Sequence, residues 1–100
     1  MKKATKKPIE LFRAAKTSGD LIKAFRKNFN IKQDDMAHAC KISQANLSAI
    51  ELNRRDVGPR VALKLAAFMG VSPDVILYPN GYELEPEYKE VRARYALNYL

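Results

Sequence analysis

The chain has 100 residues, the size of one domain, with enough apolar content for a single hydrophobic core. Its 18 Lys and Arg against 11 Asp and Glu give a net charge of +7, which suits a polyanionic partner. A single cysteine excludes an internal disulfide and a cysteine-rich metal site, and it indicates a reducing compartment. No apolar run approaches the roughly 20 residues that span a bilayer, and charged residues stand where a signal peptide would be apolar. We therefore expect a soluble, cytoplasmic protein.

The positive charge is concentrated in the N-terminal third. Residues 1–32 hold ten Lys or Arg against two acidic residues, residues 33–60 hold four of each, and residues 61–100 hold four basic and five acidic residues. The Lys-rich start has two interpretations. It is either a frayed, solubilising tail or an arm that follows phosphates or a minor groove beside a main contact.

Two helices are predicted in the first 30 residues. Pro8 suits the first turn of a short helix that runs to about Lys16. The segment 17–20 interrupts it and offers N-cap residues to a second helix, which runs to about Asn28. The apolar residues at helical spacing in this region are Ile9, Phe12, Ala15, Leu21, Ile22, Phe25 and Phe29.

Two short helices follow. The first starts near Gln33, and the acidic residues after it favour the positive end of the helix dipole. Ser43 caps the second, which covers residues 43–52. The residues that we expect these helices to bury are Met36, Ala37, Cys40, Leu47 and Ile50.

Three more helices complete the prediction. Pro59 opens a helix that Gly70 ends, and residues 72–74 cap a short helix through Leu77. Residues 78–81 form a strong stop, and residues 86–100 have helical spacing. No convincing strand is present, so the predicted architecture is all-α.

The outer face of helix 43–52 carries amide and small side chains. Burial of Leu47 and Ile50 turns four residues outward at the N-terminal end, namely Gln44, Ala45, Asn46 and Ala49. Gln and Asn pair bidentately with adenine, and alanines allow close approach and contact thymine methyl groups. The alternative is an ordinary polar helix face. Candidate contacts to a phosphate backbone surround it: Gln33, which is also placed to brace Gln44, Ser43, Ser48, Arg54, Arg55 and Arg60.

The spacing of these residues resembles the lambda-repressor-like, or Xre/Cro, helix-turn-helix family of DNA-binding transcriptional regulators. The resemblance covers about residues 20–77. The matching elements are Arg26, Gln33-Asp34-Asp35-Met36-Ala37, Ile42-Ser43-Gln44, Ile50-Glu51, Asn53, Arg54-Arg55 and Gly70-Val71-Ser72. This resemblance implies a five-helix DNA-binding domain with residues 43–52 as its recognition helix. It also implies a partly buried ion pair between Arg26 and Glu51.

Three residues depart from the family pattern. Lys41 stands where the family usually has glycine, and a left-handed Lys would cost roughly 1 kcal/mol, so we expect a slightly reshaped turn. Asn53 replaces a second glycine and tolerates the same conformation. Leu52 stands where the family often has a polar residue that contacts the DNA backbone.

The prediction for the whole chain is a five-helix lambda-repressor-like domain with a short N-terminal helix and a C-terminal helix. Residues 1–19 form a basic arm with the short helix, residues 20–78 the DNA-binding domain and residues 79–100 a tail. A stripe of Tyr88, Val91, Tyr95 and Tyr99 makes the tail a candidate dimer or partner contact, since Tyr and Arg are enriched at such surfaces. Alternatively the last helix packs back on its own domain.

Catalysis is not expected. His38 is predicted to face solvent, no nucleophile or glycine-rich phosphate loop accompanies it, and neither a metal nor another cofactor is implied. A small-molecule ligand is not expected either, since the chain is too short for a separate sensing domain. Three roles remain: a prokaryotic or phage repressor that binds double-stranded DNA at a palindromic operator as a homodimer, an antitoxin that also binds a toxin, and a protein-interaction module without DNA binding.

Overall fold

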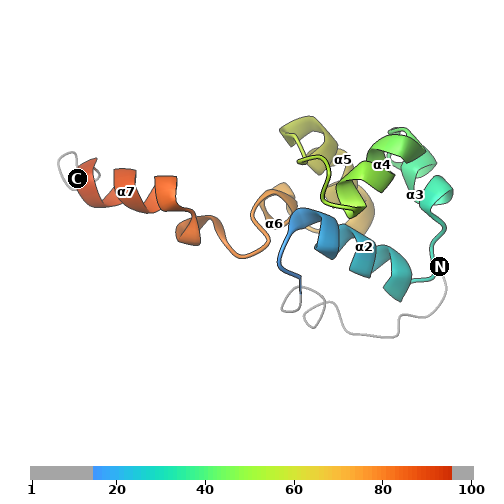
Figure 1. Cartoon of the computed structure of the whole chain (residues 1–100), viewed down its shortest axis with the longest axis horizontal. Helices are drawn as coiled ribbons and strands as arrows, with labels where there is room; N and C mark the ends of the chain where they lie inside the picture. Colours follow the sequence, from blue (N-terminus) through green and yellow to red (C-terminus); the bar gives the residue numbers. More distant parts are fainter. Residues whose placement is uncertain (1–14, 96–100) are drawn as a thin grey trace.

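The computed structural model describes residues 15–95, and every regular element in that part of the chain is a helix. In order, the elements are α2 (Ser18–Asn28), α3 (Gln33–Ala39), α4 (Gln44–Glu51), α5 (Pro59–Met69), α6 (Pro73–Leu77), the short 3-10 helix η1 (Tyr82–Leu84) and α7 (Pro86–Tyr95). Helices α2 to α6 gather into one bundle, and α7 stands away from it (Figure 1). The all-α prediction is confirmed.

Two predictions fall wholly or partly outside the described residues. They concern the basic arm with its short helix and the last residue of the tyrosine stripe, Tyr99. Of the predicted N-terminal helix only Ala15 and Lys16 are described, and neither is helical. The short helix η1 was not predicted, because only three residues form it.

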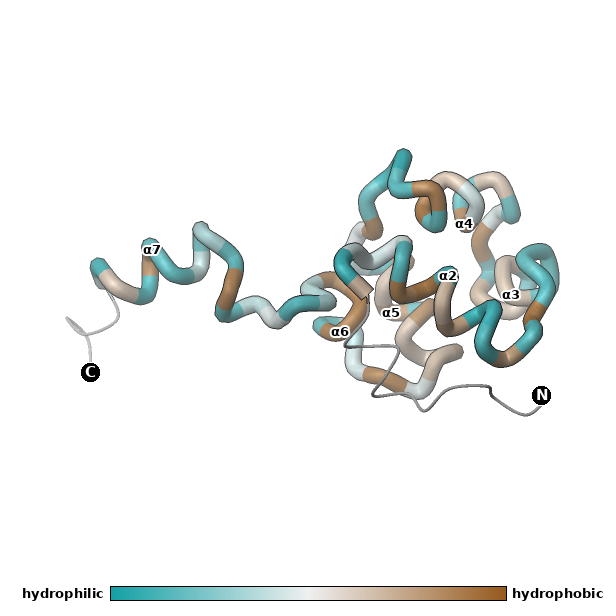
Figure 2. Tube along the Cα trace, turned by 60° about the horizontal axis from the view of Figure 1, so that its bottom comes forward, coloured by the Kyte–Doolittle hydropathy of each residue, from teal (hydrophilic) through white to brown (hydrophobic). Residues whose placement is uncertain are grey.

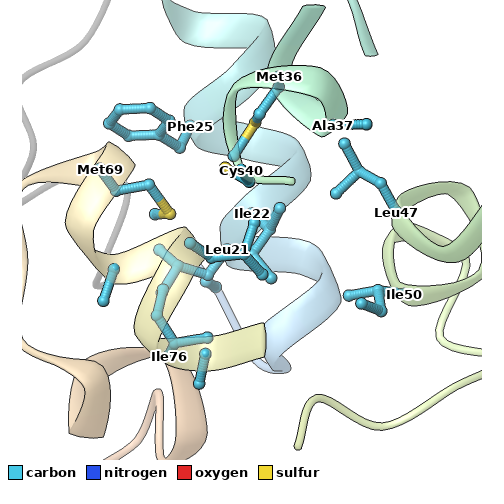
Figure 3. Close-up of a cluster of buried hydrophobic side chains, with 14 residues drawn as sticks. Leu21, Ile22, Phe25, Met36, Ala37, Cys40, Leu47, Ile50, Met69 and Ile76 are labelled. Carbon is cyan, nitrogen blue, oxygen red and sulfur yellow. The ribbon is translucent and has the colours of Figure 1, made fainter. Parts of the chain in front are cut away.

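Helices α2 to α6 share a single hydrophobic core. Apolar residues on the inner face of each helix meet in its centre (Figure 3). The core also takes in one residue before α2 and the thiol that ends α3; its members are Ala15, Leu21, Ile22, Phe25, Met36, Ala37, Cys40, Leu47, Ile50, Ala62, Leu65, Ala66, Met69 and Ile76. Along the trace of these helices, apolar residues alternate with polar ones (Figure 2). Each helix is too short to be stable alone, so this shared core holds the bundle together.

The thiol of Cys40 is buried where α3 ends. Desolvation raises its pKa, and the nearby positive charge of Lys64 lowers it by less. A buried thiol of this kind stays protonated and behaves as a small apolar side chain.

Three helices end in a left-handed residue that is not glycine. Asn30, Lys41 and Asn53 have φ values of 55°, 55° and 59°. After α3, the Lys41 N–H donates to the His38 carbonyl and the Ile42 N–H to the Ala37 carbonyl, which is the Schellman arrangement. The expectation that Lys41 would reshape the turn is therefore wrong. Two backbone hydrogen bonds and the packing of α3 against α4 hold Lys41 in the conformation that glycine would adopt more readily.

The N-terminal end of α2 lies against the C-terminal end of α4. A Cβ atom on Gly19 would stand 2.1 Å from the Ile50 carbonyl oxygen, so only glycine fits. Around this contact, Thr17 donates to the Asn53 side-chain oxygen at 2.8 Å, and the Asn53 amide donates to Asp20 at 3.1 Å. Asn53 thus ties α2 to α4 as well as ending α4.

Helix α7 buries none of its described residues. It follows η1 and lies at the end of the molecule opposite α3 and α4 (Figure 1). Val91 and Tyr95 remain 57% and 51% exposed, and Tyr88 meets the Tyr82 ring of η1. This exposure disfavours the alternative in which α7 packs back on its own domain. Within residues 15–95 no single helix is long and apolar enough to cross a membrane. By length and composition only the pair Pro59–Met69 and Pro73–Leu84 passes, and it is bent by 116°.

Candidate nucleic-acid interface

Helix α4 presents its N-terminal end to solvent. Ser43 caps the helix, because its hydroxyl oxygen accepts a hydrogen bond of 3.0 Å from the Asn46 N–H. Leu47, Ile50 and Glu51 turn into the bundle. The predicted base-reading residues lie on the other side: Gln44 and Ala45 are exposed, whereas Asn46 and Ala49 are half-buried. The structure therefore brings all four onto one helix.

Gln44 is held by the helix before it. Its amide donates to the Gln33 side-chain oxygen at 3.4 Å, and the Gln33 amide donates to Glu51 at 3.2 Å. Both ends of the Gln33 side chain are therefore occupied within the protein. This favours the bracing role of Gln33 over a side-chain contact to phosphate.

The chain of amides ends on an ion pair between α2 and α4. Arg26 Nε and Nη2 donate to the two carboxylate oxygens of Glu51, each at 2.8 Å, and Nη1 donates to the Ile31 carbonyl at 3.0 Å. The Glu51 side chain is only 3% exposed. The hydrogen bond that Arg26 donates to Glu51 raises the pKa of Arg26, and the charge of Glu51 adds to this, while burial acts in the opposite direction. This bidentate pair fixes the angle between α2 and α4.

A second contact reaches α4 from the loop that follows it. Arg55 Nη1 donates to the Asn46 side-chain oxygen at 2.8 Å. The sequence pattern predicts separate roles for these two residues, Asn46 as a base reader and Arg55 as a phosphate contact. Nine residues separate them, so no helical spacing signals the contact.

The remaining candidate backbone contacts lie around this surface. Arg54, Arg55 and Arg60 are all exposed, and Ser48 is half-buried on the flank of α4. Leu52 is 51% exposed between the helix and this loop. Of these three guanidinium groups, Arg55 is the one that a hydrogen bond places beside the first turn of α4.

The described residues contain no group of three or more His, Cys, Asp or Glu side chains that could hold a metal ion. His38 is exposed on α3, and Cys40 is buried in the core. Neither side chain takes part in the surface around α4.

Helices α3 and α4 are short and are joined by a tight turn in which Lys41 has a left-handed backbone conformation. Helix α4 exposes its N-terminus and packs on the other helices of the bundle. This arrangement defines the helix-turn-helix class of DNA-binding regulators. The helix-turn-helix family model HTH_3 matches residues 22–76. The chain belongs to this family, and so is a DNA-binding regulator rather than an enzyme.

Three solved structures share the fold. The P22 c2 repressor, solved in complex with a synthetic operator, matches with a TM-score of 0.61 and 24% identity over 66% of this chain and 100% of its own. A SinR protein/SinI protein complex matches with a TM-score of 0.59 and 24% identity, over 83% of this chain and 81% of its own. The hypothetical transcription factor NHTF from Neisseria matches with a TM-score of 0.55 and 22% identity, over 85% of this chain and 87% of its own. No curated protein matches the sequence.

Proposed function

We propose that this protein is a sequence-specific transcriptional repressor that binds a palindromic operator as a homodimer. The observation that carries the proposal is the braced end of α4, where Gln44 is held by Gln33 and, through it, by the Arg26–Glu51 pair. An amide with a fixed orientation loses less entropy when it pairs with a base, and it discriminates better than a free one. The similarity in fold to an operator-bound repressor supports the same function.

In this proposal the residues have separate tasks. Gln44, Ala45, Asn46 and Ala49 read base edges in the major groove, with adenine as the favoured partner of the two amides. The contacts to the sugar-phosphate backbone come from Ser43, Ser48, Arg54, Arg55 and Arg60, with the backbone N–H groups at Gln33 assisting them. Arg26 and Glu51 hold the reading helix in place without touching DNA.

We divide the chain accordingly. Residues 20–78 are the DNA-binding domain, residues 1–19 a basic arm, and residues 79–100 a tail that joins two copies. One such domain makes few phosphate contacts, which is why two copies on a two-fold site are needed for useful affinity. The cytoplasm, where prokaryotic or phage DNA is exposed, is the compartment that suits this role.

The proposed operator is tested by selecting bound sequences from a random duplex pool at near-physiological salt. We expect enrichment of a palindrome with A·T pairs in each half-site. If a single half-site were enriched instead, sequence reading would stand and the homodimer would not. Failure to enrich any sequence would contradict the proposal as a whole.

A pair of variants then tests the base-reading role. Gln44→Ala should lose roughly 1–3 kcal/mol of discrimination between the operator and random DNA while keeping most non-specific binding. Arg60→Ala is the matched control: it should weaken both complexes alike and lower the salt slope by about one. Titrations of both duplexes at several salt concentrations measure these effects. An equal loss on both duplexes for Gln44→Ala would refute its assignment.

An antitoxin is the second candidate. The observation in its favour is the uncovered apolar face of α7, which a toxin would cover, and one structure of the same fold is a complex of two different proteins. A neighbouring gene for a small basic toxin would support it. The third candidate, a protein-interaction module, predicts no steep loss of DNA affinity as salt increases, so the titrations above test it too.

A further inference from the structure

We propose that two copies of the chain associate through antiparallel α7 helices, with Arg94 of each copy entering an aromatic pocket of the other. This deepens the homodimer of the proposed function and rests on it for its purpose. It does not depend on DNA for its test. The occupant of the pocket is a guanidinium group, and the partner is a second copy of this chain.

Helix α7 is too short and too exposed to be stable as an isolated helix. It has 10 residues and buries none of them. Isolated helices shorter than about 12–15 residues are marginal in water, and most helices in proteins are stabilised by packing of one face. Helix α7 therefore needs more surface to pack on than the contact between Tyr88 and Tyr82 of η1 supplies.

The apolar residues of α7 recur at helical spacing. Tyr88, Val91 and Tyr95 are 39%, 57% and 51% exposed, and they recur at i, i+3 and i+7. Such spacing places them on one face and is the repeat with which two helices pair. In an antiparallel pair, Tyr88 of one helix meets Val91 of the other.

Residues of opposite charge lie beside that face at the two ends of α7. Glu87 and Arg94 are seven residues apart, so they flank the apolar stripe on the same side. An antiparallel pair brings Glu87 of each copy beside Arg94 of the other, twice in one interface. A parallel pair would instead place acidic ends together and basic ends together. Charge complementarity therefore selects the antiparallel arrangement.

A hollow lies next to Glu87 on the surface of the molecule. It has a volume of about 390 Å³ and is lined by Tyr78, Tyr82, Glu85, Glu87 and Tyr88. The rings of Tyr82 and Tyr88 meet edge to face, with their centroids 5.2 Å apart. Aromatic rings with two carboxylates suit a guanidinium group, which binds through its charge and its flat face. Arg94 of the second copy is the group that the antiparallel pairing delivers there.

Arg94 already interacts within its own copy, so its entry into that pocket exchanges one set of contacts for another. Within its own helix it lies 3.6 Å from Glu90, and both side chains are more than 60% exposed. Exposed pairs at this spacing contribute little. The interface is small, so we expect association to be weak and reversible.

The test exchanges charges in the full-length chain and measures mass by sedimentation in the absence of DNA. The wild type should associate. Glu87→Arg and Arg94→Glu should each weaken association by about tenfold or more, because each places like charges together. An equimolar mixture of the two variants should associate again, because an all-basic flank then faces an all-acidic one.

The matched control is Lys89→Glu, which reverses a charge on the side of α7 away from the apolar stripe. It should associate as the wild type does. A monomeric wild type, a mixture that stays monomeric, or a Lys89→Glu variant as weak as the other two would each overturn the proposal. So would an Arg94→Glu variant that associates normally while Glu87→Arg does not, because the antiparallel pairing needs both residues.

A second measurement separates this inference from the proposed function. Binding of each variant to a duplex with one selected half-site reports on α4 alone, and it should equal that of the wild type. Normal half-site binding with unaltered association would overturn only the α7 pairing. Loss of half-site binding in the wild type would overturn the proposed function instead.

Discussion

Glu51 illustrates how one buried charge organises a surface that it does not belong to. Its two oxygens accept three hydrogen bonds, two from Arg26 and one from Gln33. Through Gln33 the same carboxylate reaches Gln44, the residue that we expect to read a base. An exposed amide is thus linked, through one hydrogen bond of 3.4 Å to Gln33, to an ion pair several residues away, and we expect that pair to act by position and not by contact with DNA.

Breaking this pair should destabilise the fold. Arg26→Met strands the Glu51 carboxylate, so we expect a loss of roughly 3–5 kcal/mol in the free energy of unfolding, measured with urea. The control is Glu90→Gln, which removes the acidic partner of an exposed pair. It should change the free energy of unfolding by no more than a few tenths of a kcal/mol. If the double variant Arg26→Met/Glu51→Leu recovered none of the loss, stranding of the charge would not be its cause.

At the scale of elements, the closest contact in the bundle involves a residue with no side chain. Gly19 allows the first turn of α2 to touch the backbone of α4, and Asn53 closes the same junction with two side-chain hydrogen bonds. The relative position of α2 and α4 is thus fixed at both ends, by Gly19 and Asn53 at one and by the Arg26–Glu51 pair at the other.

Gly19→Ala should destabilise the protein by about 1–3 kcal/mol, because its Cβ would overlap the Ile50 carbonyl oxygen and force the helices apart. Gly58→Ala is the control, since a Cβ at that position has open space. Chemical denaturation of both variants gives the comparison. Equal stabilities would show that α2 shifts away from α4 without cost.

The helices of the bundle could be predicted because each has a local signal. Pro59 and Gly70 bound α5, Ser43 caps α4, and apolar spacing marks the buried faces. The contact between Arg55 and Asn46 and the close approach at Gly19 could not be predicted in this way. Both depend on residues brought together by the packing of whole helices. Asn30 was missed for a related reason: its left-handed conformation follows from the chain turning between α2 and α3.

For the molecule as a whole, the two proposed interfaces lie at opposite ends. The described chain measures 50 × 27 × 21 Å, and α7 extends along its longest axis, away from α4 (Figure 1). A dimer joined at α7 would hold its two recognition helices well apart. We therefore expect the selected half-sites to be separated by at least one helical turn of DNA, about 34–36 Å.

Deletion of residues 83–100 tests the independence of the two ends. Since α7 buries nothing in the bundle, the melting temperature of the shortened chain should differ from that of the intact chain by only a few degrees. Its mass should fall to that of a monomer, and its affinity for a palindrome should approach that for a single half-site. Calorimetry and sedimentation provide the readouts. An unchanged mass would show that the tail is not the dimer contact.

The buried thiol at the end of α3 can be used to detect opening of the helical bundle, because it becomes reactive only when it is exposed. Cys40 is 3% exposed, and its raised pKa leaves little thiolate at neutral pH, so alkylating reagents reach it when the core around it opens. With one cysteine in the sequence, each labelled molecule records one such event. The rate of labelling, followed by mass spectrometry, then measures how often the bundle opens. Operator DNA should lower this rate in proportion to how tightly it binds the closed form.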